Sequence, residues 1–108
     1  MGEATLVNIA NKEEVYTLKE GPNVVGRSVV GANDVNIFDP TNKVSRKHCL
    51  IEKKEGNYTV KDLDSFRGTY INGKRVSKEE KILSNKDKLG LGMGYILEFR
   101  IGEVRIDT

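Results

Sequence analysis

The sequence predicts an all-β protein, a sandwich of two antiparallel sheets with about ten or eleven short strands. Short runs rich in Val, Ile, Thr, Tyr and Leu recur along the 108 residues, and Gly, Asn, Asp or Pro bounds each run; this pattern is typical of strands and turns. No segment keeps the apolar spacing of a helix for about 11 residues. So many short strands bury their apolar side chains by forming two packed sheets.

The expected elements follow one another with short connections. Glu55-Gly56-Asn57 turns one strand into the next, and Asn72-Gly73 supplies the two positive-φ residues of a type I′ hairpin. The segment 77–83, with Ser77 and Glu80 spaced like a capping box, is expected to form one helical turn at most. The expected strands are residues 4–10, 14–18, 23–26, 35–37, 48–53, 58–62, 69–71, 87–91, 95–100 and 103–106.

Composition limits the classes of function. Hydrophobic residues make up 37% and charged residues 31%, which favours a globular domain over a disordered tail or a membrane protein. The 18 basic and 16 acidic residues nearly balance, so we expect neither nucleic-acid nor membrane binding. The start of the chain lacks the features of a signal peptide, and no apolar run approaches the ~20 residues of a membrane span. We therefore expect a single domain over residues 1–108 in an intracellular protein, cytoplasmic with a nuclear location left open.

The single cysteine and single histidine limit the chemistry further. Cys49 has no partner for an internal disulfide, and one Cys and one His are too few for structural zinc. No cofactor is expected. Cys49 and His48 are adjacent, and neighbouring residues on a strand point to opposite faces, so they do not make a nucleophile–base pair. We expect Cys49 in the core and no enzymatic activity.

Three clusters of donors stand where strands meet loops: Gly26-Arg27, the segment 45–48 and the segment 62–73. The longest expected loops, residues 27–34, 38–46 and 63–68, adjoin them, and loops at one end of a sandwich usually carry function. Arginine offers a planar fork of donors, and a serine hydroxyl or loop N–H groups take further oxygens, so a phosphate dianion is the natural ligand if the loops meet.

The order of these clusters resembles the forkhead-associated (FHA) family. Gly26-Arg27 is followed by Ser-Arg-x-His at 45–48 and by Asp-Leu-x-Ser-x-x-Gly-Thr-x-x-Asn-Gly at 62–73, and the joint order and spacing are specific where each piece alone is weak. The resemblance spans nearly the whole chain. It implies an FHA-like β-sandwich that binds phosphothreonine-containing proteins or peptides without catalysis. It also implies that Arg27, Ser45 and Arg46 bind the phosphate, and that Gly26, His48, Gly68, Thr69 and Asn72 hold the loops in shape.

Peptide specificity is expected to come from Lys43, Phe66 and Arg67. The family usually has asparagine immediately before the Gly-Thr pair, where it bonds the peptide main chain, but this chain has Arg67 there and Phe66 before it. A guanidinium only donates hydrogen bonds, so Arg67 changes how the peptide is held. In the family, the residue two before the phosphate-binding serine contacts the peptide three residues after the phosphothreonine; Lys43 stands there, which predicts an acidic residue at that peptide position.

The sequence also allows other interpretations. A phosphate-independent interaction or oligomerisation domain on the same scaffold is the main alternative, and the oligomeric state stays open. Asp62 and Asp64 suggest a paired-carboxylate site but are better explained by turn formation.

The segment 90–94 contains three glycines yet precedes a strand rather than a helix, unlike nucleotide-binding loops. The basic segment 74–86 also carries Glu79 and Glu80, and this mixture is typical of a solvated face.

Overall fold

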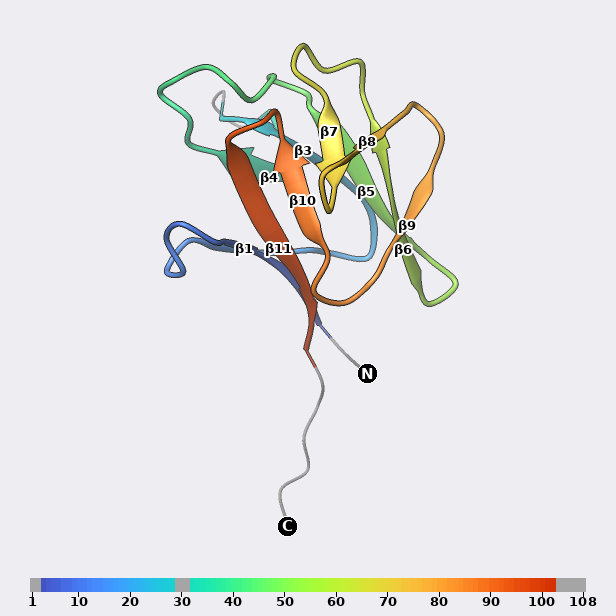
Figure 1. Cartoon of the computed structure of the whole chain (residues 1–108). Coiled ribbons are helices and arrows are strands. Elements are labelled where there is room, and N and C mark those ends of the chain that lie inside the picture. The colour runs from blue at the N-terminus through green and yellow to red at the C-terminus, as the bar shows by residue number, and fades with distance from the viewer. Residues whose placement is uncertain (1–2, 29–31, 103–108) are drawn as a thin grey trace.

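The computed structural model describes residues 3–28 and 32–102, and all regular structure in that part of the chain is β-strand. Eleven strands form two sheets packed face to face (Figure 1). The six-stranded sheet has the order β2-β1-β11-β10-β7-β8, and the five-stranded sheet has the order β4-β3-β5-β6-β9. The strands are β1 Ala4–Asn8, β2 Val15–Thr17, β3 Gly21–Arg27, β4 Val35–Ile37, β5 Cys49–Lys54, β6 Asn57–Asp62, β7 Thr69–Ile71, β8 Lys74–Val76, β9 Lys81–Leu83, β10 Lys88–Leu91 and β11 Tyr95–Ile101.

The sandwich predicted from the sequence is confirmed, with three corrections. The segment 77–83, expected to form one helical turn at most, contains strand β9, which was not expected and pairs with β6. Strand β8 is absent from the expected strands, although the predicted Asn72-Gly73 hairpin requires a second strand, and it pairs with β7 across that turn. The five-stranded sheet is not purely antiparallel, because β4 pairs with β3 in parallel. The strand expected at 103–106 lies outside the described residues.

Two-residue turns close two hairpins as the sequence predicts. Glu55 and Gly56 have φ of 51° and 82°, and Asn72 and Gly73 have φ of 51° and 86°. This pair of left-handed residues gives a turn whose twist matches that of the flanking strands. The first strand is shorter than expected because Asn8 Oδ1 accepts the N–H of Ala10 (2.9 Å), which turns the chain away.

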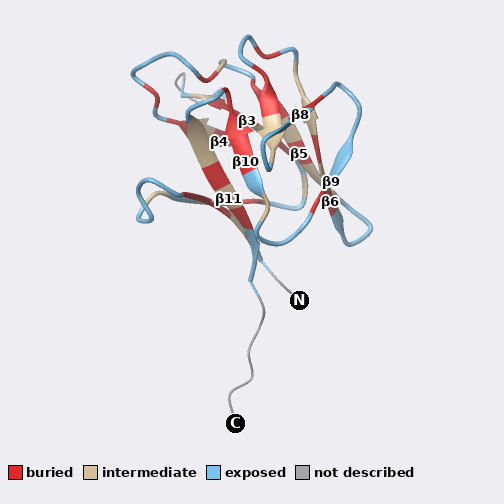
Figure 2. Ribbon diagram, in the orientation of Figure 1, coloured by how far each residue is buried: buried red, intermediate tan, exposed pale blue. Residues whose placement is uncertain are grey.

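The core lies between the sheets, and Figure 2 shows the buried residues on strands of both sheets. The ring of Tyr58 packs edge-on against that of Phe99, with centroids 5.2 Å apart. Cys49 is fully buried in this core, as predicted. The largest fully buried side chains are Phe99, Leu6, Ile37, Ile51, Leu89, Leu91, Leu97, His48, Val25, Val35, Val44 and Val60.

The two ends of the sandwich differ. The described chain ends lie side by side at one end, where the Gly102 N–H donates to Glu3 O (2.6 Å). The β4–β5 and β6–β7 loops lie at the opposite end, drawn at the top of Figure 1. No helix long and apolar enough to cross a membrane occurs in the described residues.

Candidate functional site

The end of β3 at Arg27 meets two loops at this end of the sandwich, called the loop end: the β4–β5 loop (38–48) and the β6–β7 loop (63–68). Two hydrogen bonds tie them together around Ser45. The Arg27 N–H donates to Ser45 O (2.8 Å), and the Phe66 N–H donates to Ser45 Oγ (2.9 Å). The structure therefore brings together the clusters that the sequence singled out separately.

Gly26 allows β3 to pass directly under the β4–β5 loop. A Cβ at this position would lie 1.9 Å from the carbonyl oxygen of Arg46, closer than any real contact. The same carbonyl accepts a hydrogen bond from Asn33 Nδ2 (2.8 Å), which also donates to Arg27 O (3.2 Å). Gly26 thus lets β3 lie against the backbone of the β4–β5 loop, and Asn33, which the motif did not indicate, bonds β3 to that loop.

His48 joins the β4–β5 loop to the β6–β7 loop from inside the protein. Its Nδ1 accepts the Ser45 N–H (3.0 Å), so Nε2 carries the proton and donates to Gly68 O (2.7 Å). The side chain is fully buried. Burial lowers the pKa of His48, and the hydrogen bond to Gly68 and the charge of Asp62 only partly offset this. His48 is therefore a neutral cross-link rather than a proton carrier.

The β4–β5 loop is built around Asp39. Its carboxylate accepts the N–H groups of Thr41 (3.0 Å), Lys43 (2.6 Å) and Val44 (2.7 Å), together with the Thr41 hydroxyl (2.5 Å). Burial alone would raise the pKa of Asp39, but these bonds outweigh burial and hold the pKa below its ordinary value. An ionised carboxylate thus fixes the main chain that leads to Ser45.

The β6–β7 loop is built around Asp62. Its carboxylate accepts the Ser65 N–H (3.0 Å) and hydroxyl (2.5 Å) and the Thr69 hydroxyl (2.6 Å). Ser65 Oγ in turn accepts the Gly68 N–H (3.0 Å). This confirms the interpretation of Asp62 as a turn-forming residue and shows Thr69 in a structural place; the exposed Asp64 makes no such bonds within the described chain.

Arg27 and Ser45 are held in position yet keep unused donors. The Arg27 Nε–H donates to Val44 O (3.0 Å), and its terminal guanidinium nitrogens have no hydrogen-bond partner among the described residues. Ser45 Oγ accepts from Phe66, and its hydroxyl hydrogen likewise has no acceptor there. Because the two residues are joined through the backbone, these donors lie on neighbouring parts of the loop end.

The residues expected to give specificity lie on the same two loops, and two of them pack against the β10–β11 turn. Lys43 extends toward the β10–β11 turn, where a Cβ on Gly94 would lie 3.6 Å from its Nζ. Arg67 packs on the same turn, since a Cβ on Gly92 would lie 3.3 Å from its Cβ, and its guanidinium carbon is 5.6 Å from the centre of the Phe66 ring. Phe66 is 85% exposed. Arg46 is exposed as well, above Gly26.

The remaining motif residues lie behind the loops. Gly68 has φ of +90°, and its carbonyl accepts from both His48 and the Gly92 N–H (2.8 Å). Asn72 lies further off, where Nδ2 donates to Asp87 Oδ1 (2.9 Å) and Oδ1 accepts the Lys88 N–H (2.9 Å). Asn72 therefore holds the β7–β8 hairpin to β10 and does not line the loop end.

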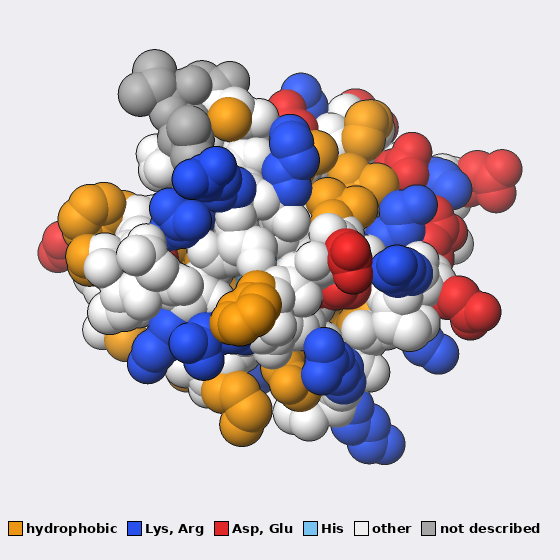
Figure 3. All heavy atoms as spheres, turned by 90° about the horizontal axis from the view of Figure 1, so that it is seen from above, with side chains coloured by type: hydrophobic (Ala, Val, Ile, Leu, Met, Phe, Trp, Pro, Cys, Tyr) orange, Lys and Arg blue, Asp and Glu red, His pale blue; other side chains and the backbone are white. Residues whose placement is uncertain are grey.

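The surface of the loop end combines charge with exposed apolar side chains. Figure 3, which looks onto this end, shows Lys and Arg side chains spread across it with hydrophobic side chains between them, and acidic side chains mostly on the right. Within residues 3–28 and 32–102, no three His, Cys, Asp or Glu side chains gather as a metal site would require. The unused donors and the Lys and Arg side chains at this end are suited to an anionic ligand.

Comparison with known proteins agrees with this class of β-sandwich interaction module. The sequence model of the FHA domain matches residues 23–92. The chain belongs to the FHA domain family, whose members are non-catalytic interaction modules that bind phosphopeptides.

Three relatives illustrate the similarity. An oxoglutarate dehydrogenase inhibitor of Corynebacterium jeikeium is 32% identical over 86 residues, 72% of this chain and 58% of its own. A solved FHA domain studied for its phosphothreonine-dependent interactions has a TM-score of 0.81 and 27% identity, covering 94% of this chain and 99% of its own. Mycobacterium tuberculosis EmbR, solved with a low-affinity phosphopeptide, has a TM-score of 0.81 and 25% identity, covering 97% of this chain and 26% of its own. The chain spans less than two thirds of the length of the curated relatives it matches.

Proposed function

We propose that residues 1–108 act as one FHA domain that binds phosphothreonine-containing segments of an intracellular partner protein and catalyses no reaction. The observation that carries this proposal is the pairing of Arg27 with Ser45. The side chain of each residue is anchored by one hydrogen bond to a loop and keeps further donors unused within the described chain. Donors fixed in advance lose little conformational entropy when a phosphate arrives.

In this proposal the phosphate is bound by Arg27, Ser45 and Arg46. The guanidinium of Arg27 and the hydroxyl of Ser45 donate to phosphate oxygens, and Arg46 approaches from the exposed side. Hydrogen bonds to charged groups contribute roughly 1.5–3 kcal/mol each. Two or three of them favour the phosphorylated over the unmodified side chain by on the order of 100-fold, at ~1.4 kcal/mol per tenfold.

The peptide main chain and flanking residues are read by Lys43, Phe66 and Arg67. The Lys43 ammonium makes no ion pair with a described carboxylate, so it is available for an acidic residue three positions after the phosphothreonine. Phe66 offers an exposed apolar ring, and Arg67 donates to a peptide carbonyl where the family usually has asparagine. An extended peptide therefore crosses the loop end with its phosphate over Ser45.

The decisive experiment titrates a degenerate phosphothreonine peptide library against the wild type and Arg27→Ala by fluorescence anisotropy. We expect micromolar or tighter binding to the wild type, at least about 30-fold weaker binding to Arg27→Ala, and none to unphosphorylated peptides. Arg100→Ala is the matched control, because Arg100 lies on β11 and pairs with Glu98, away from the loops. It should bind like the wild type.

A phosphate-independent interaction domain is the second candidate, and the exposed Phe66 favours it. If no phosphothreonine sequence binds the wild type, the proposed function is wrong. Sedimentation of the unmodified protein then tests the second candidate: a stable dimer that dissociates on Phe66→Ala would establish it.

A further inference from the structure

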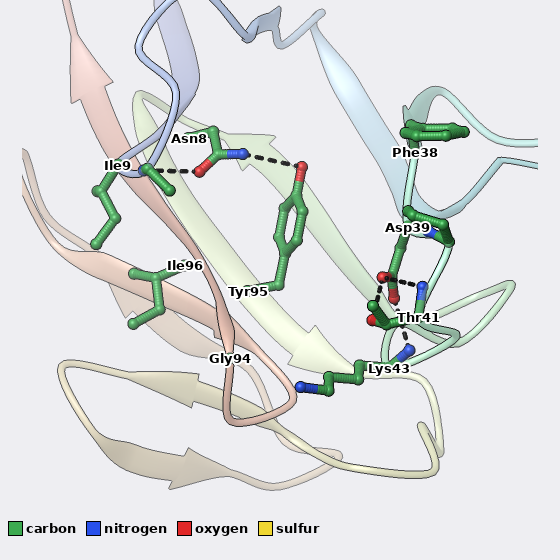
Figure 4. Close-up of a pocket in the computed structure, with 11 residues that line it drawn as sticks. Asn8, Ile9, Phe38, Asp39, Thr41, Lys43, Gly94, Tyr95 and Ile96 are labelled. Carbon is green, nitrogen blue, oxygen red and sulfur yellow. Dashed lines mark hydrogen bonds between the residues drawn. The ribbon is translucent and has the colours of Figure 1, made fainter.

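A mouth opens between the two sheets beside the proposed phosphate site. It has a volume of about 430 Å³ and lies between the β4–β5 loop on one side and the β1–β2 turn with the start of β11 on the other (Figure 4). This volume is in the range of pockets that take a small ligand or a large side chain. Its lining includes Ile9, Phe38, Asp39, Pro40, Lys43 and Tyr95.

The wall on the β11 side is fixed by a hydrogen-bonded cluster. Glu14 accepts hydrogen bonds from the hydroxyls of Tyr16 and Tyr95 and from Asn8 Nδ2, the last two at 2.6 and 2.8 Å. These bonds hold the ring of Tyr95 and join the β1–β2 turn to β11. Burial would raise the pKa of Glu14, but the three hydrogen bonds hold it below its ordinary value, so the carboxylate is ionised at neutral pH.

The opposite wall is the loop built around Asp39, and it presents an exposed ring. The bonds from Asp39 to Thr41, Lys43 and Val44 hold this loop in one shape, and Phe38 immediately before it is 75% exposed. Both walls are therefore arranged before any ligand arrives, which reduces the entropy lost on binding.

The chemistry of the mouth favours an apolar occupant. Phe38, Pro40, Ile9 and the ring of Tyr95 supply apolar surface, and Ile9 is 43% exposed. Asp39 lines the mouth, and Glu14 lies behind the lining residues Asn8 and Tyr95; both carboxylates are ionised, so an acidic side chain inside the mouth would be repelled. Burying exposed aromatic and aliphatic surface against an incoming side chain is favourable in proportion to the area covered.

The mouth is continuous with the proposed phosphate site through Lys43. Lys43 lines the mouth and reaches across it toward Gly94 (Figure 4), and Ser45 is two residues further along the same loop. A peptide whose acidic residue meets Lys43 therefore enters the mouth with the residues that follow. The positive charge of Lys43 at the edge of the mouth and the apolar surface inside it match a peptide in which a large apolar residue follows an acidic one.

We propose that this mouth is a second contact for the phosphorylated partner, taking a Leu, Ile, Met or Phe side chain four to six residues after the phosphothreonine. The inference rests on the proposed function, since the phosphate and Lys43 set the path of the peptide. It adds Phe38 and Ile9 to the residues that determine specificity. The recognised peptide segment then extends beyond the phosphothreonine and the acidic residue to an apolar residue further along.

The test compares phosphothreonine peptides that carry Asp three residues after the phosphothreonine and either Ser or Leu at each of the next three positions. We expect the best Leu peptide to bind the wild type at least about fivefold tighter than its Ser counterpart. Phe38→Ala, at an exposed position that does not support the core, should reduce this preference to less than twofold. Ile82→Ala is the matched control, because Ile82 is 63% exposed on β9, at the opposite edge of the sheet from β4; it should keep the preference.

Chemical trapping gives an independent measurement. Ala10→Cys places a thiol on the exposed β1–β2 turn, and the fully buried native Cys49 does not compete for it. A phosphopeptide with an activated disulfide five residues after the phosphothreonine should couple to Ala10→Cys faster than its unphosphorylated form does. Ile82→Cys should show no such phosphate dependence.

The outcomes separate the two proposals. Phosphate-dependent binding with equal affinity for Ser and Leu peptides, and no trapping at Ala10→Cys, would overturn the inference and leave the proposed function standing. Absence of any Arg27-dependent binding would overturn both. A dimer of the unliganded protein that Phe38→Ala dissociates and phosphopeptide does not affect would assign the mouth to a second copy of the chain, against the inference.

Discussion

The β4–β5 and β6–β7 loops are both organised by one aspartate, but the two carboxylates hold different groups. Asp39 accepts three backbone N–H groups and one hydroxyl, whereas Asp62 accepts one backbone N–H and two hydroxyls. A backbone N–H can only donate, but a hydroxyl can rotate and either donate or accept. The β4–β5 loop is therefore the more strictly defined of the two.

The proposed division of work follows from this difference. The strictly held β4–β5 loop carries Ser45, which must meet the fixed geometry of a phosphate. The β6–β7 loop presents Phe66 and Arg67, whose exposed side chains vary the contact with the partner without disturbing the carboxylate beneath them. His48 connects the loops, because its ring accepts from Ser45 and donates to Gly68.

The largest effect on stability and binding is expected from Gly26→Ala, which adds a methyl group where β3 contacts the β4–β5 loop. The added methyl group would meet the Arg46 carbonyl at 1.9 Å, so strand or loop must move. We expect the free energy of unfolding to fall by about 3 kcal/mol and phosphopeptide binding to be lost. Urea unfolding monitored by circular dichroism measures the first effect. Gly73→Ala is the control for adding a methyl group to a glycine, because no atom lies within 4 Å of that Cβ and only the cost of its positive φ applies.

The comparison of the two loops is tested directly by Asp39→Asn and Asp62→Asn. An amide nitrogen at residue 39 would face N–H donors that cannot reverse, so we expect a loss of about 2 kcal/mol in the free energy of unfolding. The hydroxyls around residue 62 can turn to accept from the amide, so the loss there should be about half as large. Asp64→Asn, at an exposed position, should change stability by less than about 0.5 kcal/mol. Equal losses for Asp39→Asn and Asp62→Asn would show that the two loops are held equally tightly.

His48, which joins the two loops, should make the free energy of unfolding depend on pH below pH 7. The pKa of His48 is lower in the folded protein than its ordinary value of 6.5, so the unfolded chain binds the proton more readily. Stability is then fully present above pH 6.5 and declines as the pH falls toward the lower folded pKa. Between pH 7.5 and 5.5 we expect a loss of about 1 kcal/mol in the free energy of unfolding. His48 is the only histidine, so a flat profile over this range would contradict the assignment.

Local chemistry explains which parts of the fold could be predicted from the sequence. The Asn72-Gly73 turn was predictable because positive φ at both positions is a property of those two residues. Strands β8 and β9 were missed because both lie in the charged segment 74–86, which is typical of a solvated face, and Ile82 in β9 is exposed. The parallel pairing of β4 could not be predicted either, since it depends on how the preceding loop returns the chain.

The residues of the candidate site were likewise predictable only where a local sequence pattern marks them. Arg27 and Ser45 were predicted from the joint spacing of the motif, and the structure brings them together. Asp39 was missed, although the sequence Asp39-Pro40-Thr41 carries the signal of an aspartate that bonds the backbone two residues on. The mouth could not be predicted, because its walls come from strands and loops far apart in the sequence.

The smallest effect is expected where the β6–β7 loop departs from its family, at Arg67. The guanidinium lies near the Phe66 ring and over Gly92, so its removal exposes little buried surface. Asparagine at this position both donates and accepts, and it can therefore bond both partners of a peptide group where arginine can only donate. We expect Arg67→Asn to leave stability within about 0.5 kcal/mol and to tighten phosphopeptide binding by about threefold, measured by anisotropy. Arg67→Ala is the control variant. If Arg67→Ala tightens binding as much as Arg67→Asn does, the gain in affinity comes from removing the guanidinium rather than from adding the amide. The β6–β7 loop of this protein then holds its peptide through Phe66 alone.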